Sequence, residues 1–160
     1  MALSDFRGKV VILAFFDSRC DETCPLTAFE LRRTHRSLGG DVEQVVFLAV
    51  NVNAVFNAPQ DVAKFTREQR LDEIPSWRFL TGTPEELVPV WEAYSIAVVA
   101  QPGEDDFEHT PGVFIIDQQG RKRWYVSTPL SDEGLVAPWA GPRLGELLVK
   151  HIRELLSGSG

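Results

Sequence analysis

Cysteine is scarce in this chain of 160 residues, which contains only Cys20 and Cys24. Two thiols cannot build a framework of disulfides, and a chain of this length can bury a sufficient core without one. A structural zinc site needs four ligands, and the three histidines are far apart in sequence. Two of them, His35 and His151, stand in helix-like segments, where we expect them to be solvated and without a role. The two cysteines are therefore expected to serve chemistry rather than stability.

Positive charge and long apolar runs are also in short supply. The chain has 16 Lys and Arg residues against 23 Asp and Glu residues, and its formal net charge is −7. The basic residues are scattered, so no nucleic-acid partner is expected. No apolar run approaches the roughly 18–20 residues that span a bilayer, and no signal peptide is visible. We expect any native signal sequence or membrane tether to lie upstream of these residues.

Strand-like and helix-like segments alternate along the whole chain, with no repeat and no linker between them. The pattern predicts strands over 9–16, 43–52 and 77–80, helices over 24–38, 59–70 and 84–94, a β-hairpin over 112–127 and a final helix over 142–156. This order is typical of a single α/β domain over residues 1–160. The cysteines at the first strand-to-helix junction and the late hairpin favour a thioredoxin-like fold. Such a fold has a central mixed β-sheet flanked by helices, with a C-terminal hairpin and helix.

Both cysteines lie in the stretch FFDSRCDETCPL, residues 15–26. Cys20 is in the predicted loop, and Cys24 is near the start of the helix that Pro25 opens. The partial positive charge of a helix N-terminus favours thiolates, so lowered pKa values are expected for both cysteines. Their offset of four residues is about one helical turn, so the two sulfurs can approach each other. The pair can then cycle between dithiol and disulfide, or it can bind a soft metal ion.

Charged neighbours act on these thiols in both directions. The carboxylates of Asp17, Asp21 and Glu22 repel a thiolate, whereas Arg19 attracts one. We expect the carboxylates to keep Cys20 less ionised than in a dedicated oxidoreductase and to attract an arriving cation.

The C-x-x-x-C spacing is one residue longer than the C-x-x-C spacing of thioredoxin-type redox motifs.

His109, in the stretch EHTPGVFIID, is the third candidate for the site. It is predicted to lie in the loop just before the hairpin. In a thioredoxin-like fold that loop faces the helix that carries the dithiol. His109 is therefore expected close to Cys20 and Cys24.

Four stretches together resemble the Sco/SenC family, copper proteins that help to assemble the copper centre of cytochrome c oxidase. They are DFRGKVVILAFF, CDETCP, WRFLTGTPEELVPVWEAY and EHTPGVFIIDQQG, in this order along most of the chain. The resemblance implies that Cys20, Cys24 and His109 bind one copper ion, as Cu(I) or Cu(II). Two thiolates suit Cu(I), and an added imidazole makes a site that also accepts Cu(II). The resemblance also implies a cytochrome c oxidase subunit or another copper or thiol protein as partner. It further implies a location in the periplasm or on the outer face of the cytoplasmic membrane.

The chain departs from the family pattern at several positions. Asn53 and Asn57 stand where aspartates are expected, and Glu108 replaces the usual aspartate before the histidine. Thr110-Pro111 follows the histidine and resembles the loop proline of thioredoxin-like reductases, so a cis peptide bond is predicted there. These differences leave the copper ligands in place but affect the surface that a partner would recognise.

Two other functions, and a purely structural thioredoxin-like module, compete with a copper chaperone. In a thioredoxin-like thiol–disulfide oxidoreductase, Cys20 and Cys24 would be a catalytic redox pair that keeps a partner's cysteines reduced. A metallochaperone is favoured over this enzyme, although the two roles can coexist because copper binding needs the reduced dithiol. A peroxiredoxin-like peroxidase requires a threonine three residues before its cysteine, and Asp17 and Asp21 occupy those positions.

Overall fold

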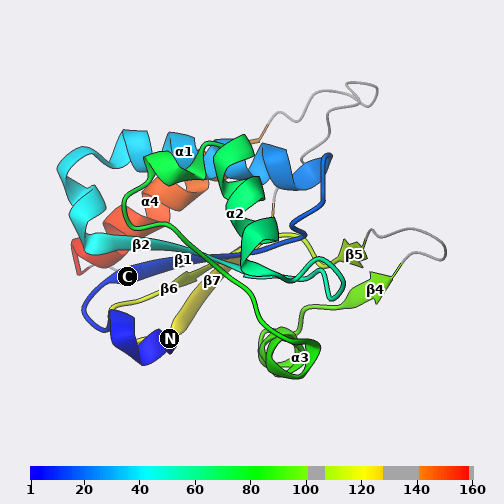
Figure 1. The fold of residues 1–160 in the computed structure, drawn as a ribbon. Helices are drawn as coiled ribbons and strands as arrows, with labels where there is room; N and C mark the ends of the chain where they lie inside the picture. The colour runs from blue at the N-terminus through cyan, green and yellow to red at the C-terminus, as the bar shows by residue number, and fades with distance from the viewer. Residues whose placement is uncertain (101–106, 128–140, 159–160) are drawn as a thin grey trace.

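A mixed five-stranded sheet forms the centre of the computed structural model, which describes residues 1–100, 107–127 and 141–158. Its strands, in spatial order, are β3 (Arg78–Leu80), β2 (Val45–Asn51), β1 (Val10–Phe16), β6 (Val113–Ile116) and β7 (Lys122–Val126). The first three are parallel to one another, β6 is antiparallel to β1, and β7 is antiparallel to β6 (Figure 1). The fold expected from the sequence is confirmed.

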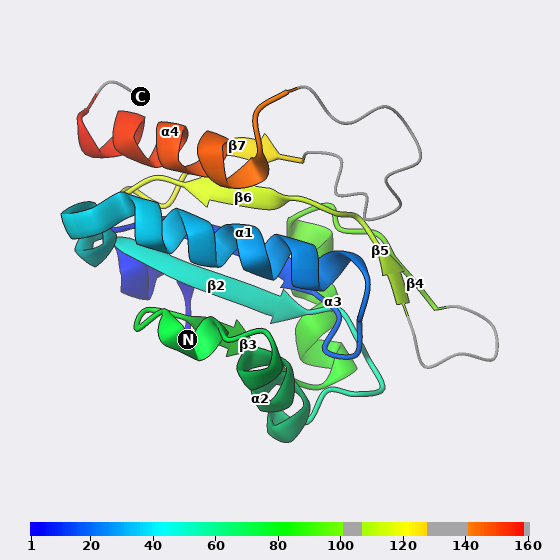
Figure 2. The same cartoon turned by 90° about the horizontal axis from the view of Figure 1, so that it is seen from above.

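Helices cover both faces of this sheet (Figures 1 and 2). One face packs against α1 (Thr23–Leu38), α2 (Pro59–Glu68) and α4 (Leu144–Leu156), and the other packs against α3 (Pro84–Ala93). Proline at the first position opens α2 and α3, where a missing N–H costs nothing. No helix in the described part of the chain is long and apolar enough to cross a membrane.

Strand β1 is a continuous apolar run because it is buried on both faces. Ile12 and Phe16 point into the core beneath α1, whereas Leu13 and Phe15 belong to the core on the side of α3. The chain therefore reaches the end of β1 with its direction fixed by packing on both sides. The cysteine loop begins at that end.

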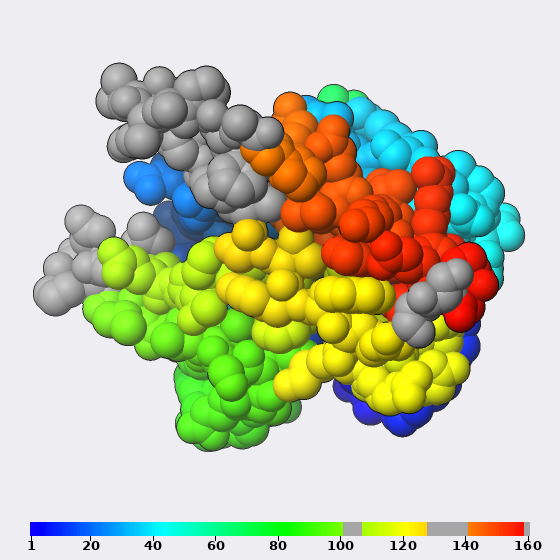
Figure 3. Space-filling view, turned by 180° about the vertical axis from the view of Figure 1, so that it is seen from behind, coloured from blue at the N-terminus to red at the C-terminus, as the bar shows by residue number. Residues whose placement is uncertain are grey.

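The C-terminal hairpin and helix also lie where the sequence places them. Gly120 has φ +79° in the turn between β6 and β7, a backbone conformation that glycine adopts without steric cost. Helix α4 packs beside β7, and Figure 3 shows the two side by side on the surface. Between them the His151 ring stacks on Trp124 at 4.4 Å, and its Nδ1 lies 2.9 Å from Glu154. The prediction that His151 is solvated is therefore wrong, because an aromatic partner on β7 covers its ring.

A second, two-stranded sheet contains β4 (Val98–Ala100) and β5 (Phe107–His109). The strands are antiparallel, and His109 pairs with Val98. The sequence predicted a loop here, which is wrong: His109 is the last residue of β5. Three-residue strands give too short a pattern to be read from sequence, and each is ordered by the other. We call this unit the β4–β5 ribbon.

Candidate metal centre

The two cysteines lie at different depths at the end of β1. Cys20 is half-buried in the loop, and its backbone N–H donates to the carbonyl of Asp17 over 3.1 Å. Cys24 is in the first turn of α1, which begins at Thr23, and only 3% of its surface is exposed. Both cysteines are free thiols. A reagent or partner therefore meets Cys20 first.

The pair shares one proton unequally. The pKa of Cys20 falls from 9.0 to about 6, chiefly because the Cys24 thiol donates a hydrogen bond to it; backbone N–H groups of Cys24 and Glu22 add to the effect. The hydrogen bond to Cys20, burial and the charge on Cys20 raise the pKa of Cys24 well above 9.0. The prediction of lowered pKa values is thus right for Cys20 and wrong for Cys24.

The expected effect of the acidic neighbours on Cys20 is also wrong. The side chains of Asp21 and Glu22 are exposed, and neither is among the causes that shift the Cys20 pKa. Glu22 acts in the opposite direction, because its backbone N–H stabilises the thiolate. Hydrogen bonds at close range outweigh carboxylates screened by water.

His109 lies directly beside Cys24. Its Nε2 is 3.7 Å from the Cys24 sulfur, and its Nδ1 is 3.0 Å from the carbonyl oxygen of Thr110. A carbonyl only accepts, so Nδ1 carries the proton in this contact and the Nε2 lone pair is left to face the sulfur. An imidazole held in this way is ready to bind a metal through Nε2.

The spacing of this pair fits ligands of one metal ion. With metal–sulfur and metal–nitrogen bonds of about 2.3 and 2.0 Å, ligands in trigonal or tetrahedral geometry stand about 3.5–3.8 Å apart. The 3.7 Å between Cys24 and His109 lies in that range. Within residues 1–100, 107–127 and 141–158, no group of three or more Cys, His, Asp or Glu side chains is gathered at metal-binding spacing. Closing such a site therefore requires Cys20 to join the pair.

The loop after His109 is built around this ring. The peptide bond between Thr110 and Pro111 is trans, so the predicted cis bond is wrong. The Thr110 backbone N–H donates to Ala97, and its hydroxyl accepts from the Ala97 N–H, each over 3.0 Å. These bonds aim the Thr110 carbonyl at His109 rather than shaping the loop as in the reductases that it resembles.

The carboxylate of Asp17 is buried beneath the site. From the sequence, Asp17 was expected to act only as an acidic neighbour of the cysteines. Asp17 is fully buried, and its carboxylate accepts hydrogen bonds from Asn53 Nδ2 at 2.8 Å, from the Arg19 N–H at 2.8 Å and from the Phe107 N–H at 3.2 Å. Asn53 is one of the asparagines that replace expected aspartates. The available signal was an aspartate placed directly after a strand that is buried on both faces.

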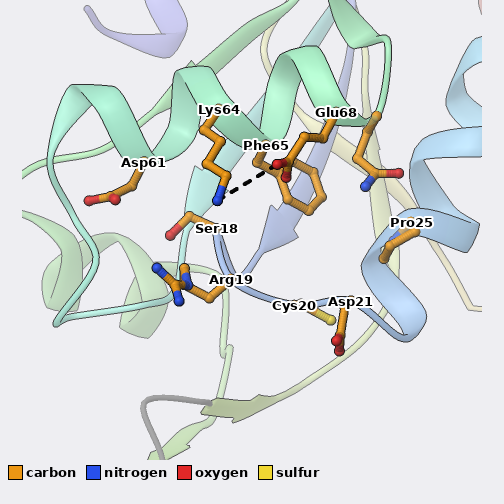
Figure 4. Close-up of a pocket in the computed structure, with 10 residues that line it drawn as sticks. Ser18, Arg19, Cys20, Asp21, Pro25, Asp61, Lys64, Phe65 and Glu68 are labelled. Atoms are coloured by element: carbon orange, nitrogen blue, oxygen red, sulfur yellow. Dashed lines mark ion pairs between the residues drawn. The ribbon is translucent and has the colours of Figure 1, made fainter.

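A cavity of about 360 Å³ opens beside Cys20, between the cysteine loop and α2 (Figure 4). Its lining includes acidic and basic side chains, among them Asp61. Two further lining residues, Lys64 and Glu68, form an ion pair at 3.7 Å. The Arg19 guanidinium lies 4.1 Å above the ring of Phe56 at the same edge. Cys20 is thus approachable from the α2 side, across a surface where charged side chains stand beside the apolar Pro25 and Phe65.

Comparison with known proteins gives a family match for most of the chain: the model described as SCO1/SenC matches residues 1–138. The chain belongs to the SCO1/SenC family. A relative described as a putative copper-binding protein of Stutzerimonas stutzeri is 26% identical over 133 residues, or 81% of this chain. The chain spans 63% of the length of that relative.

Solved structures of SCO1/SenC proteins share the fold. Copper-bound ScoI of Bradyrhizobium japonicum has a TM-score of 0.76 at 19% identity and covers 97% of this chain and 90% of its own. Yeast Sco1 has a TM-score of 0.75 at 18% identity, with 99% and 90% covered. Apo Sco1 of Thermus thermophilus has a TM-score of 0.64 at 29% identity, with 78% and 73% covered.

Proposed function

We propose that this chain is a copper chaperone of the Sco/SenC type, which holds copper as cargo between Cys20, Cys24 and His109. The observation that carries the proposal is the 3.7 Å approach of His109 Nε2 to the buried Cys24 sulfur, one helical turn from Cys20. The copper-bound structure of a protein with the same fold supports it. So does the description of the Stutzerimonas relative as copper-binding.

The donor set suits a copper ion that changes oxidation state. Cu(I) is a soft ion that two thiolates satisfy, whereas Cu(II) gains more from an imidazole nitrogen. Cys20 is already ionised near neutral pH, because its pKa is about 6. Cys24 has to lose its proton when copper binds. The half-exposed Cys20 is the ligand through which a partner would first exchange the ion.

Membership of the family supports a proposal for the recipient and the location. A subunit of cytochrome c oxidase, or another copper or thiol protein, would receive copper or reducing power from this chain. A SCO1/SenC family lipoprotein of Bacillus anthracis has the same fold, with a TM-score of 0.76 at 18% identity. This supports an extracytoplasmic location, with residues 1–160 acting as one thioredoxin-like domain beside the membrane.

Copper stoichiometry tests this function directly. Reduced wild-type protein, titrated anaerobically with Cu(I) against a chromophoric competitor, is expected to bind one ion per chain. The disulfide form and the double variant Cys20→Ser, Cys24→Ser should bind none, because no thiolate pair remains. His35→Ala, which removes an imidazole from elsewhere on α1, is the control and should bind like wild type. Wild-type affinity in the double variant would place the site elsewhere.

A second candidate is the thiol–disulfide oxidoreductase, favoured by the asymmetry of the two thiols. The Cys20 thiolate would attack a partner disulfide and release one partner thiolate, and Cys24 would then displace the second and leave a Cys20–Cys24 disulfide. Cys24→Ser should trap a mixed disulfide between Cys20 and a peptide disulfide, whereas Cys20→Ser should trap none. Equal trapping by both variants would contradict this order of attack.

A further inference from the structure

A charged side chain with no exposed surface stands at the C-terminal end of β1. Asp17 is 0% exposed. Burying a carboxylate is costly unless hydrogen bonds replace its water. Donors from three segments do so here: the cysteine loop through Arg19, the segment after β2 through Asn53, and β5 through Phe107.

The contact with Phe107 ties the β4–β5 ribbon to the main sheet. The ribbon is a sheet of its own, separate from the five-stranded sheet that ends in the cysteine loop. Phe107 is the first residue of β5, and His109 is the third. The Asp17 carboxylate holds the Phe107 N–H at 3.2 Å, two residues from the imidazole.

Asp17 also contacts Cys24, the residue that His109 faces. Its backbone N–H hydrogen-bonds the Cys24 sulfur. Residue 17 thus contacts Cys24 through its main chain and the strand of His109 through its side chain. It thus links the element that carries Cys24 to the strand that carries His109, the two side chains that approach to 3.7 Å.

We propose that Asp17 is a positioning residue, whose carboxylate fixes the β4–β5 ribbon so that His109 faces Cys24. It acts on His109 through the backbone of β5, by way of the Phe107 N–H. The effect on copper rests on the proposed function, whereas the effect on the ribbon is a property of the metal-free protein.

The variant Asp17→Asn removes this contact, together with a negative charge that helps to raise the pKa of Cys24. Its single carbonyl oxygen can still accept from Arg19 and Asn53, but its NH₂ group then opposes the N–H of Phe107, donor against donor. The main-chain bond to Cys24 is kept. The matched control is Glu108→Gln, which removes one negative charge beside His109 on an exposed side chain.

Two readouts are expected to move together in Asp17→Asn. In the metal-free protein, amide exchange at Phe107–His109 should rise at least about tenfold as the anchor is lost. Cu(II) affinity should fall about 10- to 100-fold with a changed thiolate-to-copper charge-transfer band, the usual size of an effect that orients a ligand. Cu(I) affinity should stay within about threefold, since two thiolates satisfy that ion. Glu108→Gln should change none of these.

A double-mutant cycle with His109→Ala distinguishes positioning from a general structural role. If Asp17 acts through His109, Asp17→Asn should cost no further Cu(II) affinity once the imidazole is absent. A further loss of tenfold there, or an equal loss of Cu(I) affinity, overturns the inference. So does free exchange of the Phe107 amide in the wild type, a measurement that needs no variant to fold. Wild-type protein that binds no copper overturns the proposed function, whereas equal Cu(II) binding by wild type and Asp17→Asn overturns this inference alone.

Discussion

Cys20 and Cys24 differ in exposure and in proton affinity although they are one helical turn apart. Burial and the hydrogen bond to Cys20 keep the proton on Cys24, and the same bond keeps Cys20 ionised. A Cys20–Cys24 disulfide would bind no copper. The shared proton exists only in the reduced pair, which is the form that can bind copper. In the proposed function, copper would replace the proton that joins the two sulfurs.

Proton release on copper binding tests this arrangement. Cys20 has its pKa lowered to about 6, so at pH 7.5 it is already a thiolate, and Cu(I) should displace one proton, from Cys24. Below pH 6 both thiols are protonated and two protons should leave, so affinity should fall more steeply with acid there. The measurement is the pH change on adding Cu(I), from a carrier that does not titrate in this range, to weakly buffered protein. Release of two protons at pH 7.5 would indicate two ordinary thiols.

Removal of the imidazole should separate the two oxidation states of copper. His109→Ala is expected to weaken Cu(II) binding by at least about tenfold and to leave Cu(I) binding within about threefold, because only Cu(II) depends on nitrogen. The thiolate-to-Cu(II) charge-transfer absorption reports the change. An unchanged spectrum would remove His109 from the ligands.

The candidate side chains themselves were visible in the sequence, but their environments were not. C-x-x-x-C-P located Cys20 and Cys24, and the order of motifs located His109. The pKa of Cys24 depends on its depth in the core, which a motif does not encode. The role of Asp17 depends on Phe107, 90 residues away, through a hydrogen bond that no local pattern announces.

At the scale of elements, the hairpin β6–β7 supports the His109 loop from its far side. Gly112 has φ +113°, and a Cβ there would lie 2.5 Å from the ring of Tyr125. The Tyr125 hydroxyl donates to the carbonyl of Pro111. The ring therefore occupies the space that a side chain at position 112 would need.

Gly112→Ala should lower the free energy of unfolding by about 2–4 kcal/mol, since both the backbone conformation and the contact oppose a side chain. Gly40→Ala is the matched control: its Cβ would meet nothing within 4 Å, and its change should stay within about 0.5 kcal/mol. Urea denaturation of the two variants compares them. Equal stability would show that Tyr125 can move aside.

The long elements were predictable because their patterns are local. Apolar runs gave β1 and β2, and proline at the first turn gave α2 and α3, with ends wrong by a few residues at most. The β4–β5 ribbon was missed because strands of three residues give too short a pattern to be recognised in a sequence. The prediction of a cis bond at Thr110–Pro111 was wrong because it rested on a resemblance to reductases. The hydrogen bond from His109 to the Thr110 carbonyl could not be seen in the sequence.

For the whole molecule, copper binding should appear as added stability. An ion held by residues from β5, α1 and the loop between β1 and α1 binds the folded chain more tightly than the unfolded one. At free Cu(I) about 1,000 times the dissociation constant, stability should rise by about 4 kcal/mol, which corresponds to roughly 8–16 °C in melting temperature. Calorimetry of the reduced protein measures it. The same rise in the double variant Cys20→Ser, Cys24→Ser would show that copper binds elsewhere.

X-ray absorption at the copper edge of the Cu(I)-loaded, reduced protein tests the central claim most directly. Two sulfur neighbours are expected at about 2.2–2.3 Å, and in the Cu(II)-loaded protein an added nitrogen at about 2.0 Å that disappears in His109→Ala. A first shell of oxygen and nitrogen alone, or one that is unchanged when both Cys20 and Cys24 are serine, would contradict it.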